Sequence, residues 1–129
     1  MTCFWDSILS SLHVDDFKYI NCNKKPNKKK FIELLKNKNR LIDNCFWQNN
    51  ELTKQEKEEH YEAIKCYNIN KIQGGHLTSV CDSFLLLISD LFDINIEHLY
   101  LNTNIVYKNK KNVRKTLKFS SNRGHFQRN

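Results

Sequence analysis

The sequence GGHLTSVCDSFLLLISDLFDINIEHLY, residues 74–100, contains the longest apolar segment of the chain and decides its fold. In its first half the apolar side chains recur at helical spacing, whereas in its second half they alternate as they do in a strand. Asp93 and Asn95 mark the change of period, because such residues favour turns. We therefore predict a buried helix over residues 79–92 that leads into a strand over residues 95–101. We expect this helix and strand to form the core of the protein, and taken alone they do not indicate a function.

The composition is that of one ordinary globular domain. The chain has 129 residues, of which 40% are hydrophobic and 27% are charged, so residues 1–129 are long enough to bury a single core. No apolar run reaches the roughly 18 residues of a membrane span, and the N-terminus has no signal-peptide pattern, so we expect a cytoplasmic protein with no membrane partner. The five cysteines are widely spaced and form no Cys-x-x-Cys pair. We therefore expect free thiols, with no metal site and no cofactor.

The net charge of +7 raises the question of nucleic-acid binding. Lysine supplies 17 of the 21 basic residues and is concentrated in two runs, residues 24–30 and 108–118. Arginine, which makes the bidentate contacts to bases and phosphates, is scarce. The abundance of Lys, Asn and Ile is typical of an AT-rich coding sequence, such as that of a large DNA virus or a protozoan parasite. Nucleic-acid binding therefore stays an alternative that the sequence does not favour.

The remaining elements follow from periodicity and turn residues. Apolar spacing predicts three further helices, over residues 1–12, 31–41 and 54–65. The last of these is expected to begin at a capping box formed by Thr53 and Glu56. We expect non-regular structure over residues 15–23, 24–30 and 42–53. Further strands are predicted over residues 104–107, after a turn at 102–103, and 116–119. The predicted fold class is α+β, with a small mixed or antiparallel sheet flanked by helices.

Cys3 is the residue whose position best suits a reactive group. It lies at or just before the first turn of the predicted N-terminal helix, where unpaired N–H groups and the helix dipole lower the pKa of a thiol. A nucleophilic thiolate needs an imidazole base within hydrogen-bond reach and N–H donors for the oxyanion that forms on attack. The alternative is that Cys3 is a small buried side chain without chemistry, which is the commoner fate of a cysteine.

Five histidines are candidates for that base. His125 follows the last predicted strand, and a strand end is a rigid mount for a catalytic group. His76 lies in a predicted loop after two glycines. His13 is close to Cys3 in sequence, His60 lies on a charged helix, and His98 lies in a predicted strand that leaves its orientation open. We favour His125.

These features resemble the ovarian-tumour (OTU) family of papain-like cysteine proteases, which remove ubiquitin from conjugates. The resemblance rests on Cys3-Phe4-Trp5 opening a helix, on the long apolar helix followed by strands, and on Gly124-His125-Phe126 after a short strand. It implies that Cys3 is the nucleophile and that His125 is the general base and acid. It also implies substrate contacts near Trp5, His76 and Phe126, and ubiquitin or ubiquitin-like conjugates as partners.

The chain departs from the family pattern at three places. Only Met1 and Thr2 precede Cys3, so the Asp-Gly that usually comes before the nucleophile is absent. Gln127 stands where the family has an Asn or Asp that orients the histidine, so that Gln127, Asn122 or Asn129 would take this role as neutral acceptors. The sequence of residues 43–47, DNCFW, matches the nucleophile motif even more closely, but turn residues follow it instead of a helix, so Cys3 is preferred over Cys45.

The sequence thus predicts a minimal OTU-like cysteine protease, most compatible with a viral or parasite deubiquitinase acting in the host cytoplasm. Two alternatives stay open. One is a protein of the same fold without catalysis, serving as a virion component or interaction module. The other is a small basic nucleic-acid-binding protein.

Overall fold

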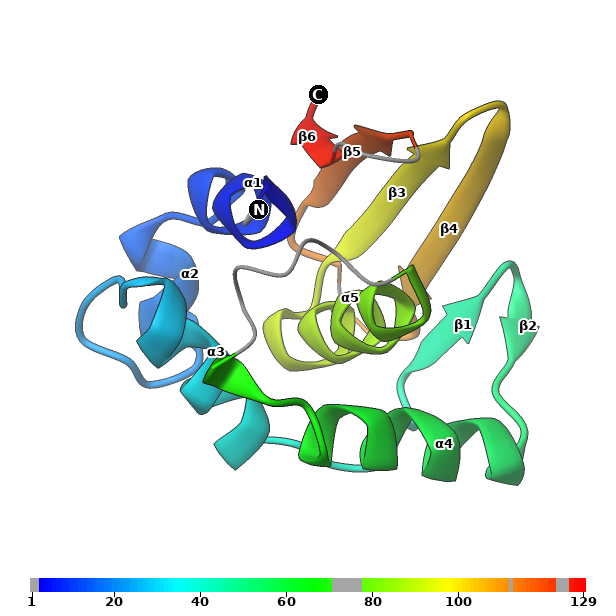
Figure 1. The fold of residues 1–129 in the computed structure, drawn as a ribbon, viewed down its shortest axis with the longest axis horizontal. Helices are drawn as coiled ribbons and strands as arrows, with labels where there is room; N and C mark the ends of the chain where they lie inside the picture. The colour runs from blue at the N-terminus through cyan, green and yellow to red at the C-terminus, as the bar shows by residue number, and fades with distance from the viewer. Residues whose placement is uncertain (1–2, 71–77, 112, 123–125) are drawn as a thin grey trace.

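The computed structural model describes residues 3–70, 78–111, 113–122 and 126–129. The helices are α1 (Cys3–Ser11), α2 (Val14–Tyr19), α3 (Lys28–Asn37), α4 (Lys54–Lys65) and α5 (Thr78–Phe92). The strands are β1 (Cys45–Trp47), β2 (Asn50–Glu51), β3 (Asn95–Tyr100), β4 (Thr103–Asn109), β5 (Thr116–Ser121) and β6 (Phe126–Arg128). The protein is therefore of the α+β class (Figure 1).

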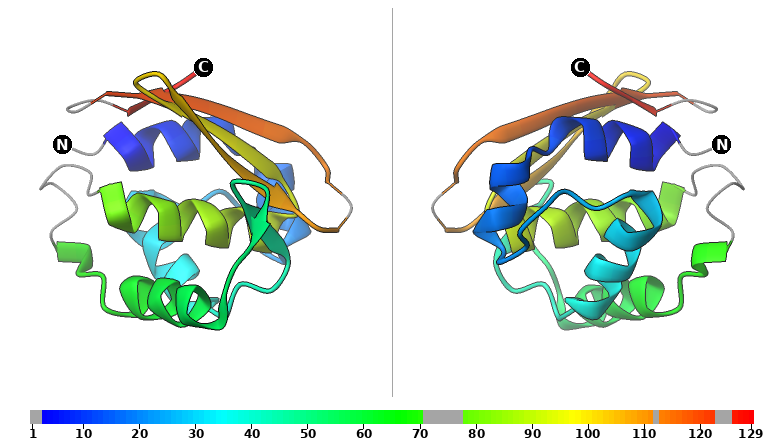
Figure 2. Two further views of the ribbon diagram at one scale, coloured as in Figure 1. Left: turned by 90° about the vertical axis from the view of Figure 1, so that its right-hand side faces the viewer. Right: turned by 90° about the vertical axis from the view of Figure 1, so that its left-hand side faces the viewer.

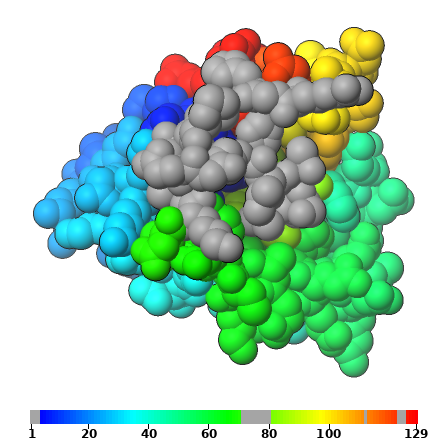
Figure 3. All heavy atoms as spheres, viewed as in Figure 1, coloured from blue at the N-terminus to red at the C-terminus, as the bar shows by residue number. Residues whose placement is uncertain are grey.

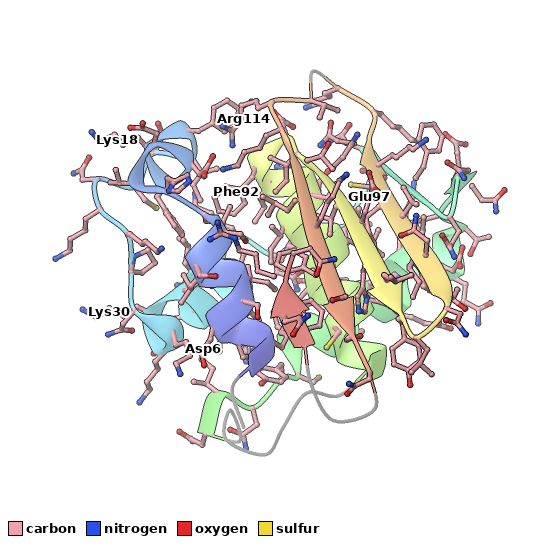
Figure 4. All side chains as sticks on the ribbon, turned by 90° about the horizontal axis from the view of Figure 1, so that it is seen from above. Asp6, Lys18, Lys30, Phe92, Glu97 and Arg114 are labelled. Carbon is pink, nitrogen blue, oxygen red and sulfur yellow. The ribbon has the colours of Figure 1, made fainter. Side chains whose placement is uncertain are left out.

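The six strands form one mixed sheet in the order β2-β1-β4-β3-β5-β6. The central strand β3 pairs antiparallel with β4 and parallel with β5, and β6 closes the edge antiparallel to β5. The helices lie on one face of this sheet (Figure 2). Figure 4 looks onto the opposite face, where Glu97 lies on β3 and the strands pass in front of α5. One face of the sheet is thus packed and the other is open.

The packed layer is built around α5. Its residues Phe84 to Ile88 are fully buried, as the apolar segment predicted. The ring of Phe84 meets Trp5 of α1 edge-on with centroids 4.8 Å apart, and it meets Tyr67 at 5.2 Å. Alternation along β3 turns Ile96 and His98 toward this layer and leaves Glu97 and Leu99 on the open face. Helices and sheet therefore share one aromatic-rich core.

The connection from β4 to β5 passes from one side of β3 to the other, because β4 and β5 flank that strand. Two basic residues at the end of this connection bind the buried carboxylate of Asp16 in α2: Arg114 at 3.1 Å and Lys115 at 2.6 Å. Burial raises the pKa of Asp16, but the hydrogen bond from the His13 N–H and the two basic partners outweigh it and lower that pKa. This cluster ties α2 to the start of β5.

The structure confirms two predicted helices closely. Helix α4 has the predicted bounds, and its capping box is formed: the Glu56 N–H donates to Thr53 Oγ1 at 3.1 Å, and the Thr53 N–H donates to Glu56 Oε1 at 2.8 Å. Helix α5 begins one residue before the predicted start. Strand β3 is also found, and the turn after it is formed by Leu101 and Asn102, with Leu101 at a φ of 54°.

Other predicted bounds were wrong. Residues 15–23 contain helix α2 instead of a simple connection, and residues 42–53 contain the β1–β2 hairpin. Helix α3 lies about one turn earlier than predicted, because the Asn27 side chain caps it by accepting from the Lys30 N–H; Leu41 lies beyond its end and is exposed. Strand β4 begins and ends outside the predicted 104–107, β5 is longer than predicted, and β6 was not predicted.

We predict that Asp16→Asn lowers the free energy of unfolding by about 2 kcal/mol at neutral pH, because it removes charge-assisted hydrogen bonds to two basic side chains. Since the native pKa of Asp16 lies below its unfolded value, this stabilisation is present above the unfolded pKa and is lost as the pH falls through the native one. Urea unfolding of both proteins at about pH 7 and about pH 2 measures the difference.

Asp15→Asn is the matched control, because Asp15 is the exposed neighbour of Asp16 on the same helix. A difference between wild type and Asp16→Asn that stays constant from neutral to acidic pH would contradict the proposed ion cluster.

Candidate active site

The two ends of the chain meet where α1 packs against β6. The Phe4 and Phe126 rings are in edge contact, with centroids 4.9 Å apart and planes at 68°. The Ser7 hydroxyl donates to the Phe126 carbonyl at 3.1 Å, and the Arg128 guanidinium donates to the Ser10 carbonyl at 2.6 Å. The C-terminal atoms accordingly lie beside the N-terminal helix in the space-filling view (Figure 3). This junction brings the sequence neighbours of Cys3 and His125 together.

Helix α1 spans Cys3–Ser11 within the predicted range 1–12, and Cys3 is its first described residue, since residues 1–2 lie outside the described part of the chain. The N–H groups of a first helical turn have no acceptor within the helix, so they are available to a negatively charged group nearby. The side chain of Cys3 lies outside the described part of the structure, as do His76 and His125. The position of this site is therefore given by Phe4 and Phe126, which follow Cys3 and His125 in the sequence and contact each other.

Trp5 and Phe126 are buried members of the core, with exposed fractions of 4% and 1%. The Trp5 indole packs against Phe31 and Phe84, and its N–H donates to the Tyr67 hydroxyl at 3.4 Å. These rings, which the sequence assigned to substrate contacts, fix α1 and β6 against the core. In this structure neither presents a ring face to the solvent.

Asn122 and Gln127, the candidate orienting residues, line one shallow hollow on the open face of the sheet. The hollow has a volume of about 130 Å³, and Leu99, Leu101, Ser120 and Ser121 complete its lining. Gln127 lies directly opposite Ser120 in the β5–β6 ladder. The third candidate, Asn129, accepts a hydrogen bond from the Ser120 hydroxyl at 2.8 Å, so its side-chain oxygen is already engaged.

Among the described histidines, His98 is the one whose ring contacts a residue of this junction, Phe126. Its ring is buried on the packed face, in contact with the Phe126 ring at 5.0 Å, and its Nε2 is 2.6 Å from the Ser121 hydroxyl. His60 is buried elsewhere, between α4 and α5, where its Nδ1 is 2.7 Å from the Ser83 hydroxyl and burial lowers its pKa. His13 is exposed just before α2. The inward orientation of His98 was left open by the sequence, since strand alternation alone does not say which face is buried.

The alternative nucleophile Cys45 is not placed for chemistry. It lies in β1 with 1% of its surface exposed, and its thiol donates weakly to the Ser89 hydroxyl and the Leu86 carbonyl. Burial raises the pKa of Cys45 to about 12. The residues that follow it, Gln48 and Asn49, form a turn with φ values of 53° and 66°. A buried thiol of such high pKa is inert.

No group of three or more His, Cys, Asp or Glu residues suited to a metal ion occurs in the described part of the chain. Among the helices that the structure describes, none is both long and apolar enough to cross a membrane.

No protein-family model matches the chain, and comparisons with curated proteins and with solved structures give no significant match.

We predict that native Cys45 resists alkylation by iodoacetamide at about pH 8, where a pKa near 12 leaves only about one thiol in 10⁴ ionised. The exposed thiol of Cys66 should react readily under the same conditions. Peptide mass spectrometry after trypsin digestion separates the two, because residues 41–54 contain only Cys45 and residues 66–71 contain only Cys66. Equal modification of both thiols before unfolding would contradict the burial of Cys45.

Proposed function

We propose that this protein is an OTU-like cysteine protease that cleaves isopeptide bonds to ubiquitin or a ubiquitin-like modifier. The observation that carries the proposal is the contact between Phe4 and Phe126, whose rings are 4.9 Å apart although the residues are 122 positions apart in sequence. Cys3 precedes the first of these residues and His125 precedes the second. Nucleophilic catalysis by a thiol requires a histidine base within hydrogen-bond reach, and in this proposal Cys3 and His125 form such a pair.

In the proposed reaction the Cys3 thiolate attacks the isopeptide carbonyl carbon and forms a tetrahedral oxyanion. N–H groups at the start of α1 stabilise that oxyanion. His125, protonated in the resting ion pair, gives its proton to the leaving lysine amine as the C–N bond breaks, which leaves a thioester on Cys3. His125 then takes a proton from water as the water oxygen attacks the thioester carbon. The C–S bond breaks, the carboxylic acid product leaves and loses its proton to solvent, and the pair of Cys3 thiolate and protonated His125 is restored.

The location of the orienting residue is also part of the proposal. Gln127 and Asn122 are exposed and line the same hollow at the end of the sheet where β6 begins. Their side-chain amides are neutral, so either would orient an imidazole with a weaker hydrogen bond than a carboxylate forms. Asn129 is less suited to this role, because its oxygen already accepts from Ser120.

The distribution of charge weakens the nucleic-acid alternative. Several of the lysines pair with acidic side chains: Lys28 with Asp6, Lys57 with Asp43, Lys110 with Glu51, and Lys115 with Asp16. These pairs come from different elements, so part of the positive charge is neutralised locally instead of forming a single basic face.

We predict that ubiquitin carrying a C-terminal electrophile labels wild-type protein at Cys3 and does not label Cys3→Ala. His125→Ala should slow labelling by at least about 100-fold, because it removes general acid–base catalysis and the ion pair. Intact-mass measurement gives the rate, and the tryptic peptide of residues 1–18 gives the site, since it contains only Cys3.

Cys66→Ala is the control for a merely exposed thiol and should label at the wild-type rate. Labelling through Cys45 would contradict the assignment of the nucleophile. The absence of labelling, with Cys3 alkylated no faster than Cys66, would instead favour the non-catalytic alternative. Binding of RNA or DNA that weakens steeply with salt would favour the nucleic-acid alternative.

A further inference from the structure

His98 contacts the chain on both sides of the segment that contains His125. On one side its Nε2 is 2.6 Å from the hydroxyl of Ser121, the last residue of β5. On the other side its ring packs on Phe126, the first residue of β6, with centroids 5.0 Å apart. A single side chain of the central strand therefore holds the end of one strand and the start of the next.

The identity of this residue is unexpected for its position. His98 is 7% exposed and shares the packed face of β3 with Ile96, and its neighbour across the parallel ladder is Phe119. An aliphatic side chain would fill such a place without the cost of burying an imidazole. Burial of the ring is tolerated because a hydroxyl from the adjacent strand satisfies one of its nitrogens. The pair is thus a specific polar contact inside an apolar layer.

We propose that His98 is a positioning residue for the reaction: through its contacts with Ser121 and Phe126 it fixes the described residues that come before and after the stretch containing His125. This inference rests on the proposed function, because it assigns the role of base to His125. The Phe126 ring also contacts Phe4, which follows Cys3, so the same set of contacts fixes the sequence neighbour of Cys3 relative to the sequence neighbour of His125. A misplacement of about 1 Å at such a site costs up to roughly 100-fold in rate.

The test uses two substitutions that remove the hydrogen bond from opposite sides. His98→Phe keeps a ring against Phe126 and removes the polar contact, and Ser121→Ala removes the hydroxyl. Ser83→Ala is the matched control for the loss of a serine hydroxyl, since Ser83 Oγ lies 2.7 Å from His60 Nδ1, away from the candidate site. A second control is His60→Phe, which breaks a buried His–Ser hydrogen bond of similar length between α4 and α5.

Two measurements separate positioning from stability. The first is the rate of labelling by the ubiquitin electrophile as a function of its concentration, which separates the limiting rate from the half-saturating concentration. The second is the pH dependence of Cys3 alkylation by iodoacetamide, followed in the peptide of residues 1–18, which reports the thiolate without any substrate. Thermal unfolding identifies variants that are folded at the assay temperature.

We expect His98→Phe and Ser121→Ala to lower the limiting rate by about tenfold to 100-fold at unchanged half-saturating concentration. Both should move the midpoint of Cys3 alkylation to higher pH, because a misplaced His125 stabilises the thiolate less. The double variant should be no slower than either single variant, since the two residues act through one contact. Ser83→Ala and His60→Phe should keep the wild-type rate and midpoint.

Folded His98→Phe and Ser121→Ala proteins with wild-type rates and midpoints would overturn the positioning role. So would a complete loss of labelling in His98→Phe together with wild-type labelling in His125→Ala, because His98 would then be the base. The electrophile could label no residue at all while the alkylation of Cys3 by iodoacetamide still depends on His125. In that case the substrate class is wrong, and the alkylation midpoints still decide the role of His98. Alkylation of Cys3 that is insensitive to His125→Ala would overturn both proposals.

Discussion

The packing of Phe126 is the interaction that holds the N-terminal helix α1 against the last strand, β6. Its ring contacts Phe4 of α1, His98 of β3 and Phe119 of β5, and its carbonyl accepts from Ser7. Strand β6 has only three residues, too few to persist as an isolated edge strand, so its stability comes from α1 lying against it. Burial of such a ring contributes about 1.5–3 kcal/mol, and here that energy joins the first helix to the last strand.

A second constraint is the parallel pairing of β3 and β5. Parallel neighbours cannot be joined by a tight turn, so the chain must cross the end of β3 after it leaves β4. The Asp16 cluster holds the far end of that crossing, through Arg114 and Lys115. With the crossing fixed, β5 runs in the same direction as β3, and both strands end at the side of the sheet where β6 and the start of α1 lie (Figure 1). The topology thereby gathers the candidate site at one end of the sheet.

Local signals explain which elements the sequence predicted well. Helix α4 has a capping box, and α5 has an uninterrupted apolar pattern, so each is determined by residues within itself. The six-residue helix α2 and the strands β1, β2 and β6 have too few residues for a period to emerge. They form because of distant contacts, such as the pairing of β1 with β4, and the sequence around them does not contain that information. The predicted order of elements, with a helix and a strand at the two chain ends and a central helix and sheet between them, was sufficient to suggest a site. It did not predict the contacts that build this site.

The tripeptide Cys-Phe-Trp occurs twice in this chain, at residues 3–5 and 45–47, and the structure places one copy in a helix and the other in a strand. In α1 the aromatic residues Phe4 and Trp5 are buried in the core, and the cysteine is the first described residue of the helix. In β1 strand alternation turns the cysteine itself inward, and burial raises the pKa of Cys45 to about 12. The Phe and Trp of this motif therefore determine how the segment packs against the rest of the protein. The reactivity proposed for Cys3 depends on the secondary structure in which the motif lies, so a match to the motif gains chemical meaning only where a helix begins near the cysteine.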